Sequence, residues 1–218
     1  MSDRREELET QLRAVEAEIA PYSPTLIVVT KTYPSSDVEI LHSLGVSNFG
    51  ENRSSEGVEK SGLVPATWHY QGEIQSKKIR EILTWADCIH SLDDSGHLEK
   101  IARALHESSS SIELFLQLSL DGDPARGGLQ ERELFTLAEK ASGISEIHLL
   151  GIMSVPPVSY EEVAAFQEIA AVHQRFIAQF PESRSLSAGM SSDYMIALEH
   201  GATHIRVGSK ILGARQYR

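Results

Sequence analysis

The sequence contains little cysteine, no long apolar run and a shortage of basic residues. Cys88 is the only cysteine among 218 residues, so an internal disulfide and a cysteine-based metal cluster are excluded. We interpret this thiol, which lies in an apolar run, as a buried structural group. No segment approaches the roughly 20 apolar residues of a membrane span, and the Arg- and Glu-rich start does not resemble a signal peptide. We therefore expect a cytoplasmic protein with no membrane association.

The shortage of basic residues restricts the partners of the chain. Lys and Arg total 20 against 31 Asp and Glu, which gives a formal net charge of -11. Proteins that bind nucleic acid concentrate Lys and Arg on one face, so we expect no nucleic-acid partner. A small anion can still bind where backbone N–H groups and a few basic side chains outweigh the repulsion of the whole chain.

Helical and strand-like patterns alternate along the chain. Leu8, Leu12, Val15 and Ile19 recur at helical spacing and predict an amphipathic helix that covers another element. Eight units of one strand and one helix follow. Their strands are predicted at 26–29, 46–50, 68–72, 88–92, 112–120, 147–153, 185–189 and 204–208. The strand at 185–189 has the weakest pattern because it is short and only partly apolar.

This alternation predicts the fold. Strands separated by helices imply a parallel sheet with right-handed crossovers, and eight such units close a barrel. We therefore predict one α/β domain over residues 1–218, a (β/α)8 TIM-type barrel with an extra N-terminal helix. A doubly wound open sheet is the alternative.

Lys31 follows the first predicted strand directly. Active sites of such barrels are built at the carboxyl ends of the strands. Partial desolvation there lowers the pKa of a lysine toward the neutral amine that attacks an aldehyde carbon. A lysine that ends a strand can equally be a solvated rim residue, so this residue alone does not identify a site.

Small-residue turns follow the last two predicted strands. The first turn spans 187–193, and the second contains Gly208 and Ser209. Backbone N–H groups and helix starts meet at these turns, where barrels of this type often bind phosphate. Ordinary capping of two helices is the other interpretation.

Arg206 lies in the last predicted strand, two residues before the second turn. A guanidinium stays protonated, so an aromatic nitrogen beside it accepts a hydrogen bond and remains unprotonated. An ion pair with an acid inside the barrel is the other interpretation. A reactive lysine, a phosphate site and this cation together describe pyridoxal phosphate (PLP). A lysine with a phosphate site also describes a Schiff-base aldolase, and the residues alone leave both open.

At these residues the chain strongly resembles the pyridoxal phosphate homeostasis protein family. The resemblance covers nearly the whole chain, and its motifs occur in the family's order at 28–34, 48–52, 68–72, 151–156, 186–191 and 205–209. It implies a monomeric or weakly associating barrel related to the cofactor domain of alanine racemases, with no established catalytic reaction.

The resemblance also implies roles for individual residues. Lys31 would hold PLP as a Schiff base, Arg206 would face the pyridine nitrogen, and Asn52 and Met153 would line the ring. The phosphate would be surrounded by Met190, Ser191, Gly208 and Ser209. Ser187, at the start of the first turn, completes the predicted set of cofactor-binding residues.

Two histidines at predicted strand ends are interpreted outside this set. We interpret His69 and His90 as hydrogen-bonded rim residues, with a general base as the alternative. The chain has no His/Cys/Asp cluster with metal-ligand spacing, so we predict no metal. Tyr33 stands where family members often carry a second lysine, and Arg126 lies in a glycine-rich loop that could act as a gate.

We therefore expect a binding protein that buffers or delivers PLP in vitamin B6 homeostasis, with PLP-dependent apoenzymes as candidate recipients. A PLP-dependent amino-acid racemase of the alanine racemase type is the alternative. Such racemases add a β-domain with a second catalytic tyrosine, whereas here the predicted barrel takes up all 218 residues. No catalytic residue is predicted.

Overall fold

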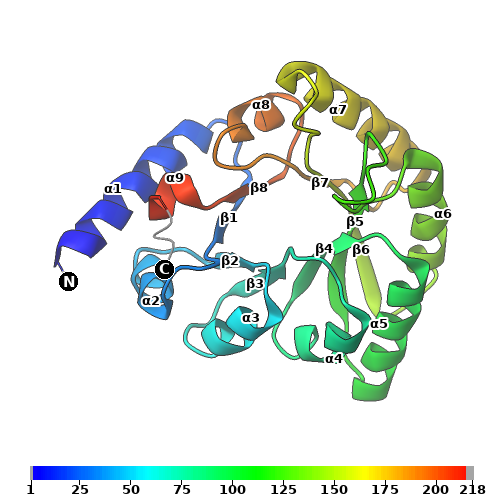
Figure 1. The fold of residues 1–218 in the computed structure, drawn as a ribbon, viewed down its shortest axis with the longest axis horizontal. Helices are drawn as coiled ribbons and strands as arrows, with labels where there is room; N and C mark the ends of the chain where they lie inside the picture. The colour runs from blue at the N-terminus through cyan, green and yellow to red at the C-terminus, as the bar shows by residue number, and fades with distance from the viewer. Residues whose placement is uncertain (1, 215–218) are drawn as a thin grey trace.

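The computed structural model describes residues 2–214, which form a closed barrel of parallel strands inside a ring of helices (Figure 1). Its strands are β1 (Thr25–Val29), β2 (Asn48–Glu51), β3 (Thr67–Tyr70), β4 (Cys88–Leu92), β5 (Ile112–Leu118), β6 (Ile147–Ser154), β7 (Ser185–Ser187) and β8 (His204–Val207). The barrel closes where β1 pairs with β8 in parallel, with Thr25 opposite His204. The (β/α)8 barrel is thus confirmed, and the open-sheet alternative is wrong because β1 and β8 pair with each other.

Helices follow the strands and cover the outside of the barrel. They are α1 (Ser2–Ile19), α2 (Ser35–Ser43), α3 (Ser54–Ser61), α4 (Ile79–Ile82), α5 (Ser95–Ser108), α6 (Glu131–Ser142), α7 (Glu162–Gln179), α8 (Tyr194–Glu199) and α9 (Ser209–Leu212), with a 3-10 turn, η1 (Ser76–Lys78), before α4. None of the helices within 2–214 is long and apolar enough to cross a membrane.

The extra N-terminal helix packs beside the end of the described chain. α1 buries the predicted apolar stripe, formed by Leu8, Leu12, Val15 and Ile19. Figure 1 shows it alongside α9, and Lys210 of α9 donates to Glu18 at 2.8 Å. Burying such a stripe stabilises the helix through apolar contact rather than through helix propensity. The prediction of a covering helix is confirmed.

Candidate functional site

A pocket of about 410 Å³ lies at the carboxyl ends of the strands. It is lined by Val29, Lys31, Asn52, Gln71, Met153, Val155, Met190, Ser191, Ser192, Arg206, Gly208 and Ser209. Eight of the nine residues predicted to bind cofactor are therefore brought together around one space. The ninth, Ser187, is fully buried in β7 and is not among the lining residues.

A larger cavity, of about 550 Å³, lies at the opposite ends of the strands. Its wall includes Thr67, Asp87 and Ile112, which stand at or just before the starts of β3, β4 and β5. Sites of such barrels lie at the carboxyl ends, so the smaller pocket is the candidate site.

A tight turn directs the chain at Lys31. Tyr33 N–H donates to the Thr30 carbonyl at 3.0 Å, and Thr32 adopts a φ of 69°. That conformation is unfavourable for a β-branched residue. The Thr32 N–H donates to Glu56 Oε2 at 2.7 Å, which holds the turn in place. Backbone strain of this kind often accompanies functional sites, and here it lies next to the half-buried lysine.

Tyr33 has a structural contact at the other end of the same turn. Its hydroxyl donates to the Gly213 carbonyl at 2.6 Å, and its side chain is largely buried. Tyr33 therefore joins the turn after β1 to the segment after α9.

A buried ionic cluster supports the end of β1. The ammonium of Lys60 donates to Glu51 Oε1 at 2.7 Å, to the Thr30 carbonyl at 2.8 Å and to Glu56 Oε2 at 3.1 Å. Thr30 Oγ1 also donates to Glu51 Oε1 at 2.6 Å. Burial raises the pKa of the Glu51 carboxyl, and the charge of Lys60 opposes that rise. Lys60 thus balances two acids that hold the residues on either side of Lys31, Glu51 at Thr30 and Glu56 at Thr32.

Replacing Lys60 by methionine is expected to destabilise the protein by about 3–5 kcal/mol, because a buried carboxylate then loses its cation. The free energy of unfolding in urea measures the effect. Lys78→Met serves as the control, since Lys78 pairs with Glu81 at the surface and exposed pairs contribute little. An unfolding midpoint for Lys60→Met equal to that of the control would contradict this account of the cluster.

Two amide side chains bring buried polar atoms to the pocket wall. Asn52 Nδ2 donates to the Gln71 carbonyl at 3.3 Å, while Asn52 Oδ1 and Gln71 Nε2 are buried without a partner. Gly50 makes room for this arrangement, because a Cβ there would lie 2.8 Å from Gln71 Nε2. Buried polar atoms are normally hydrogen-bonded. One acceptor and one donor are therefore available to a ligand at this wall.

The two small-residue turns meet at Ser191. Its Oγ accepts the backbone N–H of Gly208 at 3.1 Å and that of Lys210 at 3.4 Å. The helices after these turns, α8 and α9, have only six and four residues. The donors are therefore the backbone amides and hydroxyls of the turns, and the predicted contribution of helix dipoles is small.

Gly189 shapes the first turn, with a φ of +92°. A Cβ there would lie 2.7 Å from Ala197 Cβ and 2.8 Å from Tyr194 Cα. We expect Gly189→Ala to destabilise the protein by about 2–4 kcal/mol, from the unfavourable φ and the overlap with α8.

Gly201→Ala is the matched control in chemical denaturation, because Gly201 has a φ of +91° and nothing within 4 Å of an added Cβ. The control isolates the backbone cost of about 1–2 kcal/mol. Equal losses in the two variants would show that the close packing of the turn against α8 contributes nothing.

Arg206 forms a cationic wall of the pocket. Its guanidinium donates to Ser187 Oγ at 2.6 Å and to the Ser154 carbonyl at 3.1 Å. Burial lowers its pKa to about 10, so it remains a cation at neutral pH. Ser187 therefore lies behind the arginine, where it can act on a ligand only through Arg206.

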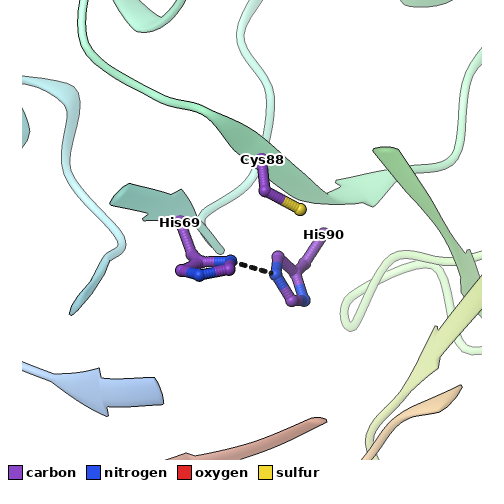
Figure 2. Close-up of side chains that lie close together, drawn as sticks. All are labelled: His69, Cys88 and His90. Carbon is purple, nitrogen blue, oxygen red and sulfur yellow. Dashed lines mark hydrogen bonds between the residues drawn. The ribbon is translucent and has the colours of Figure 1, made fainter. Parts of the chain in front are cut away.

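The inside of the barrel holds His69, Cys88 and His90 side by side (Figure 2). Their ligand atoms all lie within 4.8 Å of one another. Both histidines are hydrogen-bonded, as expected, but they are buried within their strands, so their predicted position at the rim is wrong. Alternate residues of a barrel strand point inward, and the sequence did not show which set these belong to. The interpretation of Cys88 as a buried thiol is confirmed.

Sequence reasoning missed three contributors to this region. Gln71 is the next-to-last residue of the strand predicted at 68–72, so the rule that strand ends build the site could have identified it. Glu51 directly follows the strand predicted at 46–50, so the same rule could have identified it. Lys60 gave no such signal, because it has the spacing of an ordinary surface ion pair with Glu56.

Comparison with known proteins identifies relatives over the same span. The chain matches the family described as alanine racemase, N-terminal domain, over residues 4–216. A pyridoxal phosphate homeostasis protein of Corynebacterium glutamicum is 39% identical over 205 residues, 88% of this chain and 91% of the relative. PipY of Synechococcus elongatus, solved with PLP bound, has a TM-score of 0.87 at 31% identity and covers 94% of this chain and 100% of its own.

An alanine racemase of Clostridium difficile has a TM-score of 0.80 at 13% identity, covering 94% of this chain and 59% of its own, which shows a shared fold alone. The fold and the pocket define a (β/α)8 barrel protein with a lysine and an arginine at its mouth. Within that class, the chain belongs to the pyridoxal phosphate homeostasis protein family, whose barrel is the alanine racemase N-terminal domain.

Proposed function

We propose that this protein binds PLP at the pocket, through a Schiff base on Lys31, and takes part in intracellular PLP homeostasis by buffering or delivering it. The observation that carries the proposal is the convergence of Lys31, Arg206 and the two turns at Ser191 and Gly208 on one cavity. Relatives named pyridoxal phosphate homeostasis protein, and the PLP-bound PipY structure, support it. When bound, PLP supplies an aldehyde that a lysine amine can capture reversibly.

Each part of the pocket has groups suited to one part of PLP. The backbone N–H groups of Gly208 and Lys210 donate to an oxygen, Ser191 Oγ, so phosphate oxygens can use the same donors. Arg206 donates to an acceptor such as a ring nitrogen. Asn52 Oδ1 and Gln71 Nε2 lack partners at the wall and match a ligand that carries both a donor and an acceptor.

Asn52 and Met153 would contact the ring, and Met190 and Ser209 the phosphate end, as the resemblance implied. Lys31 would contribute the reacting amine, held by the turn at Thr32. The contribution of Ser187 is indirect in this scheme, because it reaches the pocket only through Arg206.

We propose a binding role rather than turnover. Relatives over nearly the full chain are named homeostasis proteins, whereas the likeness to racemases is at 13% identity. Prolonged incubation of the loaded protein with L-alanine, followed by chiral analysis, separates the two functions. D-alanine formation at the rate of free PLP supports binding alone, and much faster formation would establish a racemase.

The experiment that tests the proposed site compares PLP with pyridoxal, which lacks the phosphate. Both can react with an exposed lysine, but only PLP can use the donors at Gly208 and Ser191. We expect the visible absorbance band to survive gel filtration with PLP and to be lost with pyridoxal. Equal retention of the two compounds would contradict a phosphate site at the turns.

A further inference from the structure

Hydrogen bonds link Arg206 to the far side of the barrel interior. Its guanidinium donates to Ser187 Oγ at 2.6 Å, and that oxygen lies 2.9 Å from His90 Nδ1. His90 Nε2 lies 2.9 Å from His69 Nδ1, and His69 Nε2 lies 3.1 Å from Asn48 Oδ1. Figure 2 marks the contact between the two histidines with a dashed line. We call these five residues the interior chain. They come from β8, β7, β4, β3 and β2.

The two ends of the interior chain determine where each proton lies. A guanidinium can only donate, so Ser187 Oγ accepts from Arg206. At the other end, Asn48 presents Oδ1 to His69 while its Nδ2 donates to Ser47 Oγ at 3.2 Å. His69 therefore carries its proton on Nε2, and its Nδ1 accepts from His90.

The middle of the interior chain follows from this direction. Because His90 Nε2 donates to His69, the proton of neutral His90 is on Nε2 and its Nδ1 is an acceptor. The hydroxyl proton of Ser187 then points at His90 Nδ1. Every contact is satisfied by one arrangement, in which all donors point away from Arg206.

Burial keeps both histidines uncharged. It lowers the pKa of His69 to about 3 and that of His90 well below its usual range, and the charge of Arg206 lowers the latter further. Arg206 is held by uncharged oxygens, those of Ser187 and Ser154. A buried cation needs such partners, and the ordered dipoles of the interior chain provide them.

This arrangement competes with metal binding at His69, Cys88 and His90. A divalent ion would need both facing histidine nitrogens unprotonated, whereas they share one proton across 2.9 Å. It would also need the thiolate of Cys88, and burial raises the pKa of that thiol.

We propose that Ser187, His90 and His69 are positioning residues, which hold the Arg206 guanidinium at the pocket wall in the orientation that meets the ring nitrogen of a bound ligand. The proposal rests on the proposed function for the identity of that ligand. Ser187 gives its only proton to His90, so the oxygen that faces Arg206 stays an acceptor. A guanidinium has five N–H donors, more than its two contacts use, so Arg206 can bind a ligand without releasing the interior chain.

The first test uses the protein without PLP and so does not depend on the proposed function. Nitrogen-15 NMR of histidine-labelled protein reports which ring nitrogen carries the proton. We expect His69 and His90, assigned through His69→Gln and His90→Phe, to be neutral with the proton on Nε2 from pH 7 to pH 5.5. A proton on Nδ1 of either ring, or a thiolate charge-transfer band after addition of Co²⁺, would overturn the interior chain.

The second test measures the effect on bound PLP. Ser187→Ala removes the acceptor, and His90→Phe removes the group that orients it while retaining the ring that stacks on Phe115. Each variant is expected to raise the dissociation constant of PLP about tenfold. Each variant should also lower the pH at which the visible band titrates. A ring nitrogen freed from Arg206 gains a proton, and the protonated ring withdraws electrons from the group that titrates.

Ser187→Thr keeps the hydroxyl and is expected to restore both values. Ser183→Ala is the matched control, because it removes a buried hydroxyl that donates to the Leu149 carbonyl away from the interior chain. A merely structural role would change stability without moving the pH midpoint.

The outcomes separate the two claims. If PLP does not bind to the wild-type pocket, the proposed function fails whatever the histidine protons show. If PLP binds and Ser187→Ala leaves the dissociation constant and the pH midpoint unchanged, the positioning role fails while the proposed function stands.

Discussion

Lys31→Ala is expected to lose all of the PLP that survives gel filtration of the wild-type protein, together with its visible band. Only a primary amine can form the covalent bond to the aldehyde, and the remaining contacts to phosphate and ring are reversible. Lys31→Arg distinguishes the covalent bond to PLP from the effect of a positive charge, because a guanidinium keeps the charge without forming a Schiff base. Both variants should therefore behave alike.

The control for this experiment is Lys77→Ala, because Lys77 is an exposed lysine outside the pocket. It should retain PLP as the wild type does. Retention of the visible band by Lys31→Arg would show that the cofactor is attached elsewhere.

Acidification from pH 7 to pH 5 is expected to cause the largest loss of stability. Burial lowers the pKa of His69 to about 3, that of His204 to about 4 and that of His90 well below its usual range. A histidine in the unfolded chain has a pKa of about 6.5. Because the folded pKa values are depressed, the unfolded state binds more protons at acid pH. Keeping these histidines neutral therefore costs no stability above about pH 6.5, and the free energy of unfolding decreases as the pH falls below that value.

Each of these three histidines changes the free energy of unfolding by about 1.4 kcal/mol per pH unit below that value. The three together lower it by up to about 6 kcal/mol at pH 5. Urea unfolding at pH 7, 6 and 5 measures the loss. His204→Asn should reduce the slope by about a third, whereas His106→Asn, at an exposed position, should leave it unchanged. A urea midpoint that stays constant from pH 7 to pH 5 would contradict the neutral interior.

The barrel could be predicted because helical and strand-like hydrophobic patterns alternate regularly along the chain. In a parallel barrel the carboxyl ends of all the strands lie at the same mouth. Even the strand with the weakest pattern, predicted at 185–189, is present as β7 (Ser185–Ser187). The same rule brought Lys31 and Arg206 together without any knowledge of side-chain contacts, whereas Asn52 was predicted from the family resemblance. These predictions needed only the order of elements and the side on which each strand ends.

The inside of the barrel could not be predicted in this way. A shift of one residue exchanges the inward and outward sets of a strand, so the sequence did not distinguish rim from interior at His69 and His90. Ser187 was assigned to the ligand because it begins a small-residue turn, yet it contacts Arg206 from behind. Lys60 has the spacing of a surface residue, and only the packing of α3 against β2 buries it.

Reductive trapping tests the central claim most directly. Borohydride reduction of the PLP-loaded protein converts a Schiff base into a stable secondary amine, and peptide mapping by mass spectrometry then locates it. We predict one pyridoxyl phosphate group per chain, on the peptide that contains Lys31. Modification spread over surface lysines such as Lys77 and Lys78, with Lys31 unmodified, would contradict the assignment of the pocket as a covalent PLP site.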